Sequence, residues 1–209
     1  MTAAPGTRLS IFPLAGALLL PRSYLPLHIF EPRYRAMVSD ALARDRRIAM
    51  IQPLPGETGE RPALFEVGCV GKVINVEAIP DGRYNLVLAG ISRFRVLREM
   101  EVSTPFRQVE AGFDGFADEE GETAALPSVV RAEIEREARR FAEARGYAVD
   151  WDEVSRLDDE ALVNGIAQVV PFDVAIKQAL LEAPDVPARA DLLAEFLRFG
   201  SLGGAPTLQ

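Results

Sequence analysis

The chain of 209 residues contains one cysteine, one histidine and one tryptophan. A single cysteine excludes an internal disulfide and any zinc cluster built on cysteines, and it fits a reducing compartment. No apolar run reaches the length of about 20 residues that a membrane-spanning helix needs. The first residues, MTAAPGTRLSIFPL, lack the basic segment and long apolar stretch of a secretory signal. We therefore expect a cytoplasmic protein with no membrane contact, no metal site and no cofactor.

The usual signatures of catalysis are also missing. The segment GCVGKV lacks the spacer and the hydroxyl residue of a phosphate loop, and it lies inside a predicted strand, which excludes an ATPase of that type. His28 and Cys69 would have to be neighbours to act as base and thiol nucleophile. Cys69 lies in the apolar strand EVGCVGKV, where a free cysteine is usually packing. A small hydrolase that uses His28 or a pair of carboxylates stays an alternative.

What the chain does have is an apolar content of 48% with 26% charged residues, as in a globular protein. The charged residues are distributed unevenly along the chain. Residues 1–110 carry 14 Lys and Arg against 11 Asp and Glu, a net charge of +3, whereas residues 111–209 carry 9 against 20, a net charge of -11. This shift predicts a boundary near residue 111. The acidic half does not favour binding to a nucleic-acid backbone.

The first half reads as strands. Short apolar runs closed by Pro or Gly predict strands in RLSIFPL, ALLLP, RRIAMIQPLPGE and PFRQVEAGFD. The longer stretch LFEVGCVGKVINVEAIPDGRYNLVLAGISRFRVLREM predicts a hairpin that reverses at Asp81-Gly82, with both residues at positive φ. Gly68, Gly71 and Gly90 lie inside its arms and predict bulges or bends. Several short, bent strands suggest a small closed or half-closed barrel.

One helix interrupts these strands, and others follow them. Pro32 fits the first position of the inserted helix, whose apolar residues recur at helical spacing from Tyr34 to Leu42. After the acidic, glycine-rich segment GFDGFADEEGETAALP, the same spacing predicts helices in PSVVRAEIEREARRFAEARG, SRLDDEALVNGIAQVV, PFDVAIKQALLEA (opened by Pro171) and DVPARADLLAEFLRFG. Their short connections favour a bundle. We expect a barrel over residues 1–118, a helical bundle over 119–200 and a flexible tail over 201–209.

Three blocks of the sequence resemble the N-terminal, substrate-binding domain of the Lon protease, in a stand-alone bacterial form. They are IFPLAGALLLPRSYLPLHIFEPRYRAMVSDALARDRRIAMI, LFEVGCVGKVINVEAIPDGRYNLVLAGISRFRVL and ALVNGIAQVVPFDVAIKQALLEAPDVPARADLLAEFL. The resemblance implies an α+β fold, with a PUA-like β pseudo-barrel that holds one inserted helix and precedes a helical bundle. It places a structural motif, His28, Phe30, Glu31, Arg33 and Tyr34, at a strand-to-helix junction. The ATPase and the Ser–Lys protease lie further along the full-length protease, so the resemblance implies no catalysis here.

We therefore expect a non-catalytic module that binds unfolded or apolar peptide segments or a partner protein. Four aromatic residues in turns or beside the linker, namely Tyr24, Phe106, Phe113 and Phe116, are the expected contacts. The alternative is that they plug the seam between barrel and bundle. A protease or chaperone component is a candidate partner, and weak homo-oligomerisation is compatible with the sequence.

A PUA-like barrel also leaves RNA or nucleotide binding open, although fold analogy alone is a weak argument. That function would require Arg93, Arg95, Arg98 and Arg107 to gather on one face, because phosphate recognition depends on clustered basic side chains.

Overall fold

A computed structural model describes residues 6–57, 59, 61–116 and 125–201. The chain divides into two compact units, residues 1–120 and 121–209. The boundary that we expected between residues 118 and 119 falls outside the described residues, and so does the expected tail apart from Ser201, which ends the last helix. Each unit is described by itself below.

The first unit contains six strands and one helix among its described residues. The strands are β1 (Thr7–Pro13), β2 (Tyr24–Ile29), β3 (Arg47–Ile51), β4 (Val67–Ala78), β5 (Tyr84–Glu99) and β6 (Gln108–Gly112), and helix α1 spans Pro32–Leu42. The α+β class is confirmed, and Pro32 is the first residue of α1. One predicted strand is wrong, because ALLLP forms no strand. One observed strand, β2, was not predicted.

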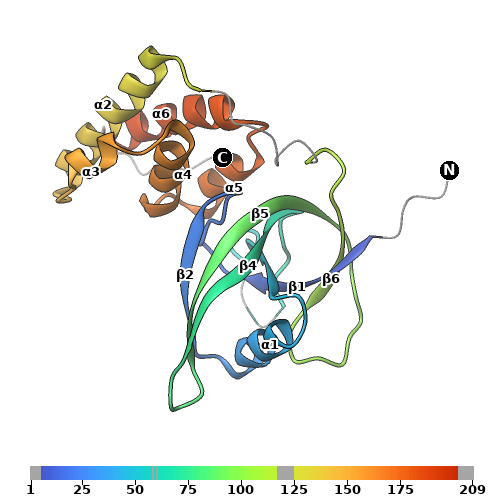
Figure 1. Ribbon diagram of the computed structural model, residues 1–209. Coiled ribbons are helices and arrows are strands. Elements are labelled where there is room, and N and C mark those ends of the chain that lie inside the picture. The colour runs from blue at the N-terminus through green and yellow to red at the C-terminus, as the bar shows by residue number, and fades with distance from the viewer. Residues whose placement is uncertain (1–5, 58, 60, 117–124, 202–209) are drawn as a thin grey trace. The chain divides into compact units, whose positions relative to one another are not determined.

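Five strands close into a barrel (Figure 1). β1 pairs with β3 in parallel and with β6 in antiparallel fashion, while the antiparallel pairs β3–β4, β4–β5 and β5–β6 complete the ring. The long strand β5 serves two neighbours in turn, because residues 84–89 pair with β2 and residues 95–99 pair with β6. β2 therefore extends the sheet outside the closed ring.

Glycines permit the bend that closes the barrel. Gly71 pairs with Gly90, but the next pair is Val70 with Ser92, so Ile91 is an extra residue of the kind that forms a β-bulge. A Cβ at Gly90 would lie 1.9 Å from the carbonyl oxygen of Leu20, a distance that no side chain tolerates. The predicted bend at these two glycines is confirmed.

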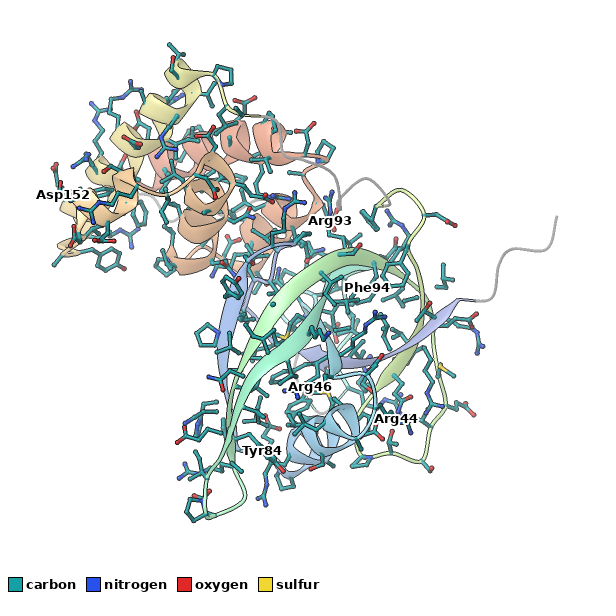
Figure 2. All side chains as sticks on the ribbon, viewed as in Figure 1. Arg44, Arg46, Tyr84, Arg93, Phe94 and Asp152 are labelled. Atoms are coloured by element: carbon teal, nitrogen blue, oxygen red, sulfur yellow. The ribbon has the colours of Figure 1, made fainter. Side chains whose placement is uncertain are left out.

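The barrel is filled by alternating apolar residues of its strands. Its core consists of Leu9, Ile11, Ala49, Ile51, Val70, Phe94, Val109 and Ala111. Phe94, labelled in Figure 2, has no exposed surface. Its ring fits because Gly68 leaves room, since a Cβ there would lie 2.6 Å from ring carbons of Phe94. The ALLLP segment also contributes buried side chains, although it is not a strand.

The hairpin between β4 and β5 reverses as expected in position but not in conformation. Gly82 adopts a positive φ of 83°, whereas Asp81 does not. Asp81 stabilises the turn through its carboxylate instead, which accepts a hydrogen bond from the backbone N–H of Arg83 at 3.1 Å. An Asx-type bond of this kind requires no left-handed residue before the glycine.

The second unit is helical. Its helices are α2 (Ser128–Arg145), α3 (Trp151–Ser155), α4 (Asp159–Val169), α5 (Val174–Glu182) and α6 (Val186–Ser201). The four predicted long helices are present, and the short helix α3, which carries the labelled Asp152 in Figure 2, was not expected. α5 begins after Asp173, whose carboxylate accepts from Ile176 N at 2.8 Å, rather than at Pro171.

The bundle is held by apolar contacts and by a buried arginine. α6 packs against α2, α4 and α5. Arg189 of α6 is buried and donates to the carbonyl oxygen of Leu180 at 2.8 Å and to Oδ1 of Asn164 at 3.0 Å. Over the described part of the chain, every helix is too short or too polar to cross a bilayer.

Candidate functional site

The nine residues singled out from the sequence lie in three places on the first unit. Tyr24 and His28 lie on β2, and Phe30 directly follows its last residue. Glu31, Arg33, Tyr34 and Phe106 line a hollow at the start of α1, here called the α1 hollow. Phe113 and Phe116 line a second hollow after β6, here called the β6 hollow. The expected aromatic patch is therefore not one surface.

The α1 hollow has a volume of about 670 Å³. Its apolar wall comes from the end of β1 and from the segment between β5 and β6, through Pro13, Met100, Val102, Pro105 and Phe106. Met100 and Val102 are half-buried, so part of each side chain is available to a ligand. Phe106 corrects our prediction, because only 4% of it is exposed. It shapes the floor of the hollow and does not project from a loop.

One side of the α1 hollow carries a charged cluster centred on Glu99. Arg107 donates two hydrogen bonds to this carboxylate, at 2.9 and 2.7 Å, and a third to the carbonyl oxygen of Pro62 at 2.8 Å. Arg61 donates to Oε1 of Glu99 at 2.6 Å. These hydrogen bonds hold the pKa of Glu99 below its ordinary value, and the bonds from Arg107 have the largest effect. The carboxylate therefore stays ionised and fixes the segment around Arg107.

Another side of the α1 hollow is an aromatic and charged stack at the N-terminus of α1. The ring of Tyr34 lies 4.2 Å from that of Phe12 between centroids, and the guanidinium of Arg33 lies 4.5 Å above it. Arg33 also donates to Oε2 of Glu31 at 3.0 Å. Burial raises the pKa of Tyr34 above its ordinary value, so the phenol is neutral at physiological pH. The motif residues thus form a fixed wall.

The β6 hollow has a volume of about 490 Å³ and places Phe113 and Phe116 together, with Ile91, Val70 and Ser92 around them. Phe113 packs against the barrel core. Phe116 carries the guanidinium of Arg93 at 4.9 Å from its ring centroid. Both aromatic rings therefore have partners within the first unit. Their role as plugs between the two units stays a prediction.

Along β2, the exposed residues alternate with residues that face inward. Tyr24 is 65% exposed but is the first residue of the strand and does not lie in a turn, and Phe30 is 60% exposed. Pro26 carries no N–H, and a proline on an outermost strand disfavours the addition of a further strand. Peptide binding by extension of the sheet is therefore poorly supported at this edge.

His28 links this strand to its neighbours through side-chain contacts. Its Nδ1 lies 2.7 Å from Oδ1 of Asn85 on β5, and Asn85 donates in turn to Glu77 of β4 at 3.0 Å. Cys69 is buried and pairs across the sheet with Arg93. His28 pairs with Asn85, which lies eight positions before Arg93 on β5. At the rise of a β-strand, His28 and Cys69 are therefore separated by roughly 25 Å along β5. They cannot form a nucleophile and base.

The four arginines proposed for RNA binding do not form a free basic face. Arg93 is buried. Arg95 pairs with Glu66 at 3.1 Å, Arg98 with Glu110 at 2.6 Å and Arg107 with Glu99 at 2.7 Å. Carboxylates that already neutralise these guanidinium groups weaken the case for phosphate recognition. Among the residues that the structure describes, no group of three His, Cys, Asp or Glu side chains could hold a metal ion.

Arg61, Met100 and Val102 were not selected from the sequence. Met100 and Val102 alternate with polar residues in EMEVST, which is a weak signal of an apolar side, and Arg61 lies in a loop remote in sequence. Only the closure of the barrel brings this loop, the segment after β5 and the start of α1 together.

Residues 8–198 match the family described as the ATP-dependent protease La (LON) substrate-binding domain. The chain belongs to this family. It is 28% identical over 193 residues to Lon protease 2 of Myxococcus xanthus and 30% identical over 196 residues to the Lon protease of Salinispora arenicola. These alignments cover 90% and 91% of the chain but 23% of each relative. The chain thus matches about a quarter of the length of each of these proteases, the part that corresponds to the substrate-binding domain.

Two solved structures have the same fold. A Lon N-terminal domain protein from Xanthomonas campestris matches with a TM-score of 0.65 at 21% identity, and the N-terminal domain of a Mycobacterium avium complex Lon protease matches with a TM-score of 0.62 at 20% identity. Each match covers 91% of the present chain and 98% of the solved one. The α+β fold implied by the motif residues is confirmed.

Proposed function

We propose that the first unit binds an apolar segment of an unfolded or partner polypeptide in the α1 hollow and makes no covalent change to it. The observation that supports this proposal most is the combination of half-buried Met100 and Val102 with a fixed wall of paired charges around about 670 Å³ of space. Sites for small ligands and side chains usually have volumes of about 300 to 1,000 Å³, are lined by apolar groups and are largely preformed.

The β6 hollow is the weaker candidate. Phe113 already packs on the barrel core, and the ring of Phe116 is covered on one side by Arg93. A ligand would have to displace that guanidinium to use this face of the ring. In the α1 hollow, by contrast, apolar surface of Met100 and Val102 is accessible without rearrangement.

The family match also supports a binding function without catalysis. Its description names a substrate-binding domain, and its proteolytic relatives are four times longer than the region that the chain matches. We propose that bond cleavage belongs to other polypeptide segments and that a protease or chaperone component receives the bound substrate. A cytoplasmic location stays a prediction.

Binding can be measured with fluorescein-labelled β-casein, an unfolded protein, by fluorescence anisotropy. The double variant Met100→Asp/Val102→Asp places two charges on the apolar wall. We expect it to bind at least about tenfold more weakly, because lost burial of one large apolar side chain costs about 1.5 to 3 kcal/mol. Val129→Asp is the matched control, since Val129 is 75% exposed on the second unit. It should bind like the wild type.

Two outcomes would contradict the proposal. One is equal binding by the double variant and the control while circular dichroism shows both to be folded. The other is a loss of binding in Phe116→Ala with none in the double variant, which would move the site to the β6 hollow.

A further inference from the structure

The arginines of the α1 hollow differ in how fully their guanidinium groups are used. Arg107 is 13% exposed, and its three donor nitrogens bind Glu99 twice and the carbonyl oxygen of Pro62. Arg33 is held by Glu31 and by the ring of Tyr34. Both are parts of the wall and have little capacity for a ligand.

Arg61 is different. Its side chain is 69% exposed, and within the described residues its one ion-pair partner is Glu99. The hydrogen bond to Glu99 uses one of its three nitrogens, Nη2, and Arg61 lines the hollow. Glu99 does not depend on Arg61, because the two hydrogen bonds from Arg107 remain if Arg61 turns away. Release of an exposed pair of this kind has little effect on stability.

The charge balance around the hollow favours an acidic group on the ligand. Residues 1–110 have a net charge of +3, in a chain whose net charge is -8. Three arginines and one carboxylate, Glu31, are among the described residues that line the hollow. Glu99 does not line it but pairs with two of these arginines, which leaves one positive charge in excess. An acidic group on a ligand would meet a complementary field there.

We propose that Arg61 selects the polypeptide segments that the α1 hollow accepts: the preferred ligand is an apolar segment flanked by an acidic residue. The apolar side chain contacts the wall of Met100 and Val102, and the flanking carboxylate accepts hydrogen bonds from the exposed guanidinium of Arg61. This inference rests on the proposed function of the hollow and adds its ligand class. Arg61 is a specificity-determining residue and takes no part in chemistry.

The test uses two fluorescein-labelled synthetic peptides with the same Leu-Phe-Leu centre, one flanked by Glu and the other by Gln. The wild type should bind the Glu peptide about twofold to fivefold more tightly, which is the range of a partly exposed ion pair. Arg61→Ala should lose this preference and bind the Gln peptide as the wild type does. Arg61→Lys keeps the charge and should keep most of the preference.

Arg98→Ala is the matched control, because Arg98 is 65% exposed and paired with Glu110. It should leave the preference unchanged. Equal binding of both peptides by the wild type, or a preference that persists in Arg61→Ala, would overturn the inference while leaving apolar binding in the hollow intact. If neither peptide binds and β-casein does not bind either, the proposed function itself fails.

Discussion

Arg107 donates two hydrogen bonds to the carboxylate of Glu99, and the same carboxylate accepts a bond from Arg61. This arrangement ties the last residue of β5 to the segment before β6 and to the loop that precedes β4. Arg61, which lies 38 positions before Glu99 in the sequence, is thereby held at the same carboxylate as Arg107. Because Arg61 and Arg107 line the α1 hollow, Glu99 holds part of its wall in place.

Replacing Glu99 by glutamine should therefore loosen the hollow. We expect Glu99→Gln to lower the free energy of unfolding by about 1 kcal/mol, because a partly exposed ion-pair network contributes about that amount. Urea denaturation measures the change. Glu66→Gln is the control, since Glu66 is 77% exposed in its pair with Arg95 and should have little effect. Equal loss in both variants would contradict a special role of Glu99.

The second unit contains a carboxylate whose pKa makes stability depend on pH. Asp159 accepts from Arg131 at 2.7 Å and from the backbone N–H of Leu126 at 2.8 Å, and these bonds lower its pKa. A carboxylate with a lowered folded-state pKa contributes stability above its unfolded pKa of about 4, and this contribution is lost as pH falls through the folded pKa.

Asp159→Asn should therefore be less stable than the wild type at pH 7 by about 1 kcal/mol, the usual contribution of such a bond. The difference should shrink as the pH falls below about 4. Thermal unfolding at several pH values measures it. A difference that stays constant down to pH 2 would show that the ionisation of Asp159 does not matter.

The bend of the barrel predicts opposite effects for two glycine substitutions. Gly90→Ala would place a methyl group 1.9 Å from the carbonyl oxygen of Leu20, so the backbone must shift. We expect a loss of about 3 kcal/mol, as for severe overpacking. Gly165→Ala in α4 meets nothing within 4 Å and should stabilise the helix by about 0.5 to 1 kcal/mol. Chemical denaturation separates the two, and a neutral Gly90→Ala would contradict the close approach.

Local signals in the sequence were sufficient for much of this fold. The hairpin of β4 and β5, the start of α1 at Pro32 and the long helices follow from periodicity and from proline and glycine chemistry. β2 was not predicted because Pro26 inside a short apolar run suggests a turn, although proline is tolerated on an outermost strand. α3 was not predicted because a helix of five residues is too short to show a helical period of apolar residues.

The candidate site could be predicted only in part. Glu31, Arg33 and Tyr34 were expected as a structural motif and not as contacts of a peptide, but all three line the α1 hollow. Phe106 was found for the wrong reason, because a phenylalanine between Pro105 and Arg107 suggests an exposed loop, whereas the barrel buries it. Arg61, Met100 and Val102 depend on long-range pairing of β5 with β6 and on the path of the loop before β4. Neither is encoded in local spacing.

Hydrogen–deuterium exchange with and without unlabelled β-casein tests the central claim most directly, because it locates the bound segment without any substitution. The account predicts slower exchange in the backbone around residues 31–34 and 99–107, with no change around residues 112–116. Protection confined to residues 112–116, or to the helices of the second unit, would contradict binding in the α1 hollow.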